Sequence, residues 1–491
     1  MMFANLVFST ALCWLVSGSV TDALLPGLSV RLTKKGIDHG TKFGTEYVNK
    51  LIRRLPIPNI DTKKGNAKVH LSKMTVMRYN SPQFLYSYDR KIGKFTFRAQ
   101  NADLDIFGRW KASYLLLGKE LKNSGTFSAA VKKFSISTTF GLEQLGDHLT
   151  IKGFKCVANL KTLGLELYGG TLAAFILNLF RNLIARSIKP VIEVQVCAQA
   201  KAVVDTKLND YLALYPLHFD FLKTYRADFG LVSRPIVSTS VIDTFHKGEI
   251  RLIKPPKQSP MFPTPMDRTG SDAGRMVNVF LSDYAANTFL YNAHLAKKSQ
   301  IIISEQKYPN LNKTLALTCD GVLFCLGTIF PQLADKHPEG TGEINFQTLI
   351  PPVLNVQKDK INLHSKVFLG VKTHDNGKVI AAFDLKLSFV GHFEVDLNAH
   401  GDLKGKLVID SFTADEALPK EIQVDRKKLQ KLLDSSRPLM TFVANRLLQK
   451  GFPVIDFGKY RLKRPKLLLR RRTVVFNTDI DFTKKKKKKE K

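Results

Sequence analysis

The chain has 491 residues, of which 44% are hydrophobic, so it is long enough for two or more domains and is not disordered over most of its length. Its 75 lysine and arginine residues outnumber its 42 aspartate and glutamate residues and give a formal net charge of +33. This charge favours polyanions or anionic membrane surfaces as partners. The run from Lys484 to Lys489 supplies only part of it, so the remainder shapes the field of the folded body.

Residues 1–21 have the pattern of a signal peptide. An uncharged, mostly apolar run from Phe3 to Val16 is followed by the small residues Ser17, Gly18 and Ser19, although no lysine or arginine precedes the run. We therefore expect the mature chain to be secreted and extracellular.

Two stretches have the apolar spacing of amphipathic helices, Thr33 to Arg54 and Thr171 to Leu214. The second places apolar side chains on one face and Asn178 and Arg181 on the other. Polar residues interrupt its apolar run before the roughly 18 residues that a membrane span requires, so a transmembrane interpretation is poor. Pro190 is expected to kink or divide this helix.

The longer helix has two interpretations. It is either a core helix of an ordinary domain or a helix that closes a cavity holding an apolar molecule. Periodicity does not separate them, because both place the same apolar face against the rest of the protein.

Strand patterns follow the first helix. Apolar and polar residues alternate around Phe95 and Phe97 and again around Leu104 and Ile106, as in half-buried antiparallel strands. The polar stretch Lys119 to Gly125 is predicted to be a hairpin connection between two such strands.

A proline-rich segment divides the chain into halves of similar length. Five prolines fall between Lys254 and Asp267, which favours an extended, semi-stiff linker. The second half repeats the plan of the first: Ser282 caps a helix that runs to Lys297, alternating strands follow, and a late helix runs from about Val424 to Lys450. This repetition indicates an internal duplication.

Four cysteines remain after the leader, and an even number in an oxidising compartment favours disulfide bonds. Cys156 lies in a strand pattern and Cys197 late in the long helix, so a bridge between them would pin helix to sheet. Cys319 and Cys325 are close enough in sequence to pair locally. The histidines and cysteines show no zinc-ligand spacing, so we expect no metal.

Six separated sequence blocks, in order, resemble the bactericidal/permeability-increasing protein and lipopolysaccharide-binding protein family, within the superfamily that has tubular lipid-binding domains. The resemblance covers Pro26 to Phe482. The blocks are PGLSVRLTKKGIDHGTKFGTEYVNKLIRRLPIP at residues 26–58, GRWK at Gly108 to Lys111, the cysteine pair Cys156 and Cys197, the proline linker, RMVNVFLSDYAANT at Arg275 to Thr288, and LQKGFP at Leu448 to Pro453.

The resemblance implies an α+β fold. In the resembling family, and so by expectation here, this fold is an elongated boomerang of two pseudo-symmetric barrels, each a highly twisted antiparallel sheet wrapped around long helices, joined by a central sheet. The implied domains are a signal peptide (1–21), an N-terminal lipid-binding barrel with a basic tip (22–252), the proline-rich linker and central sheet (253–270), a C-terminal lipid-binding barrel (271–482) and a poly-lysine tail (483–491).

The resemblance also implies two kinds of lipid site and no cofactor other than bound phospholipid as a ligand. The tip would bind the phosphates of lipid A through flexible cationic side chains. From the basic clusters of the sequence itself, the residues expected to form this tip are Lys63, Lys64, Lys68, Arg90, Lys91, Lys94, Arg109, Lys111, Lys119 and Lys122. The phospholipid pockets would be lined by Ile37, Phe43, Tyr47, Leu51, Phe175, Ile176, Leu179, Leu183, Phe289 and Phe442. Trp110, between two basic residues, is expected to lie at a membrane interface. Asn312 begins a glycosylation sequon.

The leading hypothesis is therefore a secreted, monomeric, non-catalytic protein of innate immunity that binds lipopolysaccharide, phospholipid and anionic bacterial membranes, and heparin-like polyanions as a further class. The alternative is a phospholipid or neutral-lipid transfer protein without antibacterial activity. An enzyme is disfavoured because no GxSxG, HExxH or glycine-rich phosphate loop is present. Nucleic-acid binding would explain only the lysine tail.

Overall fold

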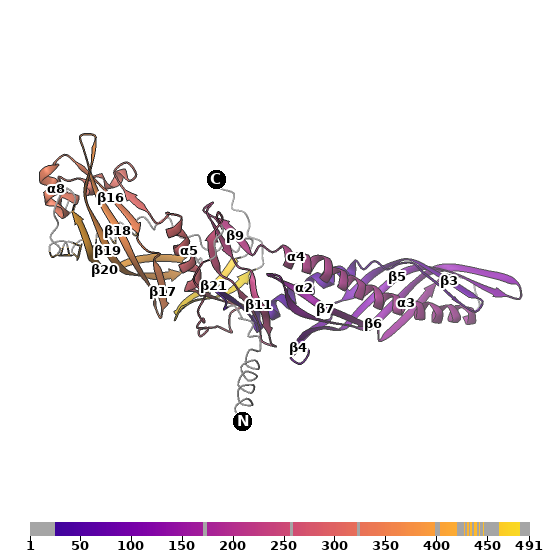
Figure 1. Ribbon diagram of the computed structural model, residues 1–491. Coiled ribbons are helices and arrows are strands. Elements are labelled where there is room, and N and C mark those ends of the chain that lie inside the picture. The colour runs from indigo at the N-terminus through magenta and orange to yellow at the C-terminus, as the bar shows by residue number, and fades with distance from the viewer. Residues whose placement is uncertain are drawn as a thin grey trace, which may run out of the picture. The chain divides into compact units, whose positions relative to one another are not determined.

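A computed structural model describes residues 25–169, 174–255, 259–321, 325–397, 403–419 and 461–481, together with scattered residues between 427 and 445. The predicted signal peptide, the poly-lysine tail and most of the predicted late helix lie outside the described residues. The protein is α+β and rich in antiparallel sheet (Figure 1). No helix in the described ranges is both long and apolar enough to span a bilayer.

The chain folds into two compact units. The N-terminal unit comprises residues 32–216 and 234–243; the C-terminal unit comprises residues 1–31, 217–233 and 244–491. The proline-rich segment, at which the sequence predicts a boundary, lies inside the C-terminal unit by this division.

The N-terminal unit is built on a seven-stranded antiparallel sheet with the order β2-β3-β5-β6-β7, in which β4 pairs with β5 and β8 pairs with β6. Its strands are β2 (Ile60–Lys64), β3 (Ala67–Asn80), β4 (Gln83–Asp89), β5 (Lys94–Leu116), β6 (Lys119–Leu145), β7 (His148–Asn159) and β8 (Thr162–Tyr168). In β5, Leu104, Ile106 and Trp110 are buried on one face while Asp105 and Arg109 lie on the other. The predicted alternation is confirmed.

Both predicted helices are present: α2 (Lys34–Arg53), and α3 (Ala174–Val203) followed by a π-helical turn, η1 (Val204–Leu208), and α4 (Asn209–Leu214). The Thr33 hydroxyl caps α2 by accepting a hydrogen bond from the Gly36 N–H. Of the two effects predicted for Pro190, division of the long helix is wrong, because α3 runs through it, and a kink stays a prediction. Ile188 and Ile192 on either side are fully buried, and this packing holds the helix together across the proline.

Helix α3 packs against β2, β3, β7 and β8 and runs along the sheet in Figure 1. Its apolar face includes Phe180, whose ring centroid lies 6.3 Å from that of Trp110. Trp110 is 0% exposed and donates its indole N–H to the Thr126 carbonyl at 3.1 Å. The expectation that Trp110 lies at a membrane interface is therefore wrong. The pleat turns the two flanking basic side chains outward and this ring into the core.

The hairpin between β5 and β6 does not lie where the polar stretch predicted it. Leu116 pairs with Lys119, so the turn consists of Leu117 and Gly118, and Lys119 to Gly125 is the beginning of β6. Both turn residues have positive φ, 50° and 79°, which is the conformation of a tight two-residue hairpin. The polar residues of this stretch therefore belong to the solvent-exposed end of a strand and not to the turn.

Both predicted disulfides are present. Cys156 on β7 is bonded to Cys197 on α3, and Cys319 is bonded to Cys325. The first bond fixes the long helix to the sheet that it covers.

The C-terminal unit contains most of three further sheets, with the orders β11-β12-β1-β14-β22-β21, β13-β10-β9 and β15-β16-β18-β19-β20, in which β17 pairs with β18. The strands are β1 (Leu28–Thr33), β9 (His218–Phe221), β10 (Tyr225–Asp228), β11 (Leu231–Val237), β12 (Val241–His246), β13 (Glu249–Leu252), β14 (Val277–Ser282), β15 (Ile301–Ile303), β16 (Thr341–Thr348), β17 (Val353–Gln357), β18 (Lys360–Asp375), β19 (Lys378–Leu397), β20 (Leu403–Pro419), β21 (Arg461–Arg470) and β22 (Thr473–Asp481). The helices are α5 (Asp283–Leu295), η2 (Pro309–Leu311), α6 (Asn312–Leu315), α7 (Leu326–Ile329) and α8 (Pro331–Lys336).

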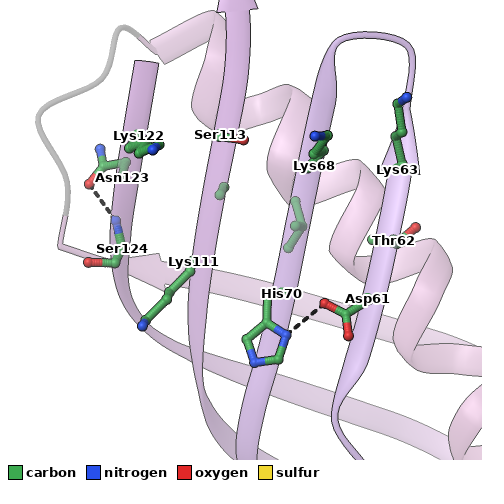
Figure 2. Close-up of a pocket in the computed structure, with 12 residues that line it drawn as sticks. Asp61, Thr62, Lys63, Lys68, His70, Lys111, Ser113, Lys122, Asn123 and Ser124 are labelled. Atoms are coloured by element: carbon green, nitrogen blue, oxygen red, sulfur yellow. Dashed lines mark hydrogen bonds and ion pairs between the residues drawn. The ribbon is translucent and has the colours of Figure 1, made fainter. Parts of the chain in front are cut away.

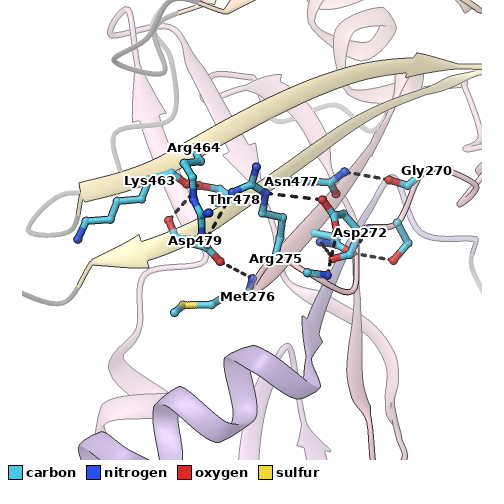
Figure 3. Close-up of polar contacts among 12 residues, drawn as sticks. Gly270, Asp272, Arg275, Met276, Lys463, Arg464, Asn477, Thr478 and Asp479 are labelled. Atoms are coloured by element: carbon cyan, nitrogen blue, oxygen red, sulfur yellow. Dashed lines mark hydrogen bonds and ion pairs between the residues drawn. The ribbon is translucent and has the colours of Figure 1, made fainter.

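The buried Asp479 carboxylate organises polar contacts on β22 (Figure 3). It accepts hydrogen bonds from Arg464 on β21 at 2.7 Å and from Arg275 at 3.4 Å, and its second oxygen accepts from the Met276 N–H at 3.0 Å. Nearby, Asn477 donates to the Gly270 carbonyl at 2.9 Å. These contacts fasten the end of the proline-rich segment to the six-stranded sheet.

Candidate functional site

A groove of about 710 Å³ lies on the N-terminal unit where β2, β3, β5 and β6 run side by side (Figure 2). It occupies the solvent-facing side of the sheet, since Lys68, Lys111 and Lys122 are exposed while the neighbouring Val69 and Ala112 are buried. The lining residues are Asp61, Thr62, Lys63, Lys68, Val69, His70, Lys111, Ala112, Ser113, Lys122, Asn123 and Ser124.

Strand register arranges the polar side chains in two rows, which Figure 2 shows one above the other. The first row, called here the lysine row, is Lys63, Lys68, Ser113 and Lys122, each directly opposite the next across β2, β3, β5 and β6. The second row is Asp61, His70, Lys111 and Ser124 in the same order of strands.

The lysine row places like charges together. Lys63 and Lys68 are direct cross-strand neighbours, an arrangement that destabilises a sheet unless a counter-charge is present. Within the part of the chain that the structure describes, Lys63, Lys68 and Lys111 form no ion pair with an acidic side chain. The groove is therefore a preformed cationic surface that an anionic ligand would stabilise.

Two carboxylates at the groove already have partners. Lys122 Nζ lies 3.0 Å from Glu120 Oε2, and hydrogen bonds from Lys122 and then from Ser113 lower the pKa of Glu120, so this side chain stays ionised. Asp61 Oδ1 lies 2.7 Å from His70 Nδ1 on the neighbouring strand. Four lysines remain against these two acids, and the groove keeps a net positive charge.

The ten predicted cationic residues fall into three groups. Lys63, Lys68, Lys111 and Lys122 line the groove. Three more lie near the groove. Lys64 is at the end of β2 and Lys119 is at the start of β6, while Arg109 lies two residues before Lys111 on the same face of β5.

The remaining three, Arg90, Lys91 and Lys94, lie at the hairpin that joins β4 to β5. That hairpin is at the opposite end of β5 from the groove. At a rise of roughly 3.4 Å per residue, Lys94 and Lys111 are on the order of 60 Å apart along this strand. The structure therefore does not bring these three residues to the groove.

Sequence reasoning missed the uncharged and acidic half of the groove: Asp61, Thr62, His70, Ser113, Asn123 and Ser124. The sequence does indicate which side chains of β2 and β3 share a face, because side chains alternate on either side of the Gly65 turn and so place Lys63 and Lys68 together. Register with β5 and β6 was not available from the sequence, because the two-residue turn at Leu117 and Gly118 sets it at the groove and the polar stretch placed that turn elsewhere.

The predicted phospholipid-pocket residues do not form one cluster among the described side chains. Leu183 is buried in the main core of the N-terminal unit and Leu179 packs against it. Ile37 is buried on α2, Leu51 is half-buried there, and Phe289 packs against Tyr225 in the C-terminal unit. The side chains of Phe43, Tyr47, Phe175 and Ile176, and residue Phe442, lie outside the described part of the chain, so the pocket stays a prediction.

Two further predicted features concern modification and metal binding. Asn312 is exposed at the start of α6, and its glycosylation stays a prediction. Among the described residues, no group of three or more His, Cys, Asp or Glu side chains is arranged to hold a metal ion.

Comparison with known proteins shows that the fold of this chain has been seen before. The crystal structure of lipopolysaccharide binding protein superposes with a TM-score of 0.59 at 19% sequence identity, covering 94% of this chain and 100% of the other. Two family models match the sequence: the N-terminal domain of the LBP / BPI / CETP family at residues 36–211 and its C-terminal domain at residues 221–482. The chain belongs to the LBP / BPI / CETP family.

Curated relatives agree with this assignment. The chain is 23% identical to bactericidal permeability-increasing protein of Sebastes schlegelii over 488 residues, which covers 96% of this chain and 99% of the relative. It is 24% identical to lipopolysaccharide-binding protein of Mus musculus over 355 residues, or 70% of each chain. The family consists of lipid-binding and lipid-transfer proteins, so this chain is a lipid-binding protein and not an enzyme.

Proposed function

We propose that this protein is a secreted lipid-binding protein that recognises bacterial lipopolysaccharide through the groove at the tip of its N-terminal unit and holds phospholipid in apolar pockets, with an antibacterial role in innate immunity. The observation that carries the proposal is the set of four lysines that line the groove, three of which, Lys63, Lys68 and Lys111, form no ion pair with an acidic side chain among the described residues. The named relatives support this choice of ligand.

The chemistry of lipid A fits the groove. Its phosphates are compact anions, and lysine ammonium groups bind such anions as point charges from several directions. Lys68 and Lys122 are separated by one intervening strand, so their Cα atoms are roughly 10 Å apart. Two phosphate groups on one sugar backbone can each reach a cation across that distance.

Export is supported by separate observations. The leader pattern at residues 1–21 and two disulfide bonds both favour an oxidising, extracellular location. We propose a monomer that acts at anionic bacterial surfaces, with heparin-like polyanions as a second class of partner.

Equilibrium binding of the full chain to two kinds of phosphatidylcholine vesicle tests the proposal. One kind contains lipid A and the other contains phosphatidylglycerol at the same surface charge. We expect at least tenfold tighter binding to lipid A, because clustered phosphates engage the lysine row together. Equal affinity for the two surfaces would contradict specific recognition and leave only a general attraction to anionic membranes.

The alternative is a lipid-transfer protein without antibacterial activity. It is favoured by the 22% identity to phospholipid transfer protein of Mus musculus over 308 residues, which covers 62% of this chain. Exchange of fluorescent phospholipid between neutral vesicles distinguishes the two functions. Rapid exchange together with no preference for lipid A would establish the alternative.

A further inference from the structure

The turn at the end of the β5–β6 hairpin is strongly apolar and exposed. Leu115 and Leu116 are 47% and 42% exposed, and Leu117, the first residue of the two-residue turn, is 96% exposed. Leu117 buries almost nothing, and Leu115 and Leu116 each leave more than two fifths of their surface in water, so the fold gains little from the apolar character of this turn.

Leu117 is also a poor residue for the backbone conformation it adopts. Its φ of 50° lies in the left-handed region, where the side chain of an ordinary L-residue is crowded and where asparagine, aspartate and glycine are favoured. Gly118, at φ 79°, is the residue that such a turn requires. An Asn-Gly turn would be more stable than Leu-Gly, so the leucine is disfavoured both by its exposure and by its backbone geometry. Conflicts of this kind concentrate at functional positions.

The leucine turn is held beside the cationic groove. Leu115 donates its N–H to the Asn66 carbonyl, and the Asn66 amide donates to the Leu115 carbonyl, both at 3.1 Å. These bonds fix the turn against the β2–β3 hairpin, which carries Lys63 and Lys64. Lys119 and Lys122 lie on the other side, at the start of β6. The apolar turn thus has exposed lysines on both sides, and the one acidic neighbour on β6, Glu120 opposite Leu115, is paired with Lys122.

We propose that Leu115, Leu116 and Leu117 insert into the acyl-chain layer of an anionic lipid surface while the lysine row binds the phosphates above it. This arrangement is complementary to a lipid surface, in which charge lies outside and hydrocarbon lies beneath. The inference rests on the proposed function. To the electrostatic contact of the groove it adds an apolar contact, which salt does not weaken.

The test replaces Leu117 by asparagine in the full chain and measures binding to vesicles of phosphatidylcholine and lipid A. We expect at least about tenfold weaker binding, because a leucine side chain no longer enters the hydrocarbon. The thermal unfolding temperature should stay the same or rise, because asparagine suits the left-handed turn. Added sodium chloride should weaken the remaining binding of the variant more strongly than it weakens the binding of the natural protein.

The matched control is Leu145→Asn. Leu145 is 61% exposed at the β6–β7 hairpin of the same sheet, where it pairs with His148 and the connecting residues are Gly146 and Asp147. This variant should bind lipid A vesicles like the natural protein. A second test variant, Leu117→Gly, keeps the turn geometry without any side chain and should reproduce the loss.

A soluble probe separates this inference from the proposed function. Deacylated lipid A keeps the phosphates and lacks the chains, so the natural protein and Leu117→Asn should bind it equally. If the folded Leu117→Asn and Leu117→Gly variants bind lipid A vesicles as tightly as the natural protein, acyl insertion is overturned while the groove proposal stands. If the natural protein binds neither vesicles nor the probe, both proposals fail.

Discussion

Replacing Lys63, Lys68 and Lys122 together by glutamine is expected to weaken binding to lipid A vesicles by about two orders of magnitude. Each lysine at an anionic lipid surface contributes about 1 kcal/mol, so the three contribute about 3 kcal/mol, or on the order of 100-fold in affinity. Folding should not suffer, because the change removes repulsion between the opposed Lys63 and Lys68. Vesicle co-sedimentation at fixed salt measures the affinity, and urea unfolding measures the stability.

A second triple variant provides a control with the same change in net charge. In this variant glutamine replaces Arg90, Lys91 and Lys94. These three residues lie at the hairpin at the far end of β5. We expect this variant to keep most of the affinity. An equal loss in the two variants would mean that total charge governs binding and that the groove has no special role.

Removing the Cys156–Cys197 disulfide by substituting both residues with serine is expected to lower the free energy of unfolding by about 4 kcal/mol. The two residues are 41 apart in sequence, and a closed loop of this length restricts the unfolded chain strongly. The bond also fixes α3 to β7, so hydrogen exchange along the helix should accelerate. Urea unfolding of the oxidised protein and the variant gives the difference.

The second disulfide is the internal comparison for this prediction. Cys319 and Cys325 are only 6 residues apart, so replacing both by serine should cost about 2 kcal/mol. A larger loss from the short loop than from the long one would contradict the chain-entropy account.

Much of the fold could be predicted because its signals are local. The period of apolar residues in α2 and α3 and the alternation in β5 depend on near neighbours in sequence, and each follows from the burial of one face. The pairing of Cys156 with Cys197 followed from placing one on a strand and the other on the helix. The helices and strands did not depend on how distant segments meet, whereas the disulfide joins segments 41 residues apart.

The candidate site was only partly predictable, because strand register decides which charges meet. The pattern of charge was the same at Arg90 to Lys94 as at the groove, yet β5 places the two groups at opposite ends. Trp110 was misjudged because its basic neighbours suggested a surface, whereas alternation along β5 points the ring at Phe180. The turn at Leu117 was missed because its residue type disfavours the conformation it adopts.

At Pro190 a local sequence signal gave the wrong prediction, because tertiary packing overrides it. Proline removes one backbone hydrogen bond from a helix interior. The buried neighbours Ile188 and Ile192 anchor both sides of that position in the core, and α3 continues.

Protection of individual lysines from acetylation tests most directly whether the four lysines that line the groove hold the phosphates of the ligand. The full chain is labelled with and without lipid A, and mass spectrometry gives the labelling rate at each site. Lys63, Lys68, Lys111 and Lys122 should be labelled several-fold more slowly when lipid A is bound, while Lys91 at the far hairpin should be unaffected. Unchanged rates at the four groove lysines under saturating lipid A, or protection at Lys91 instead, would contradict the account.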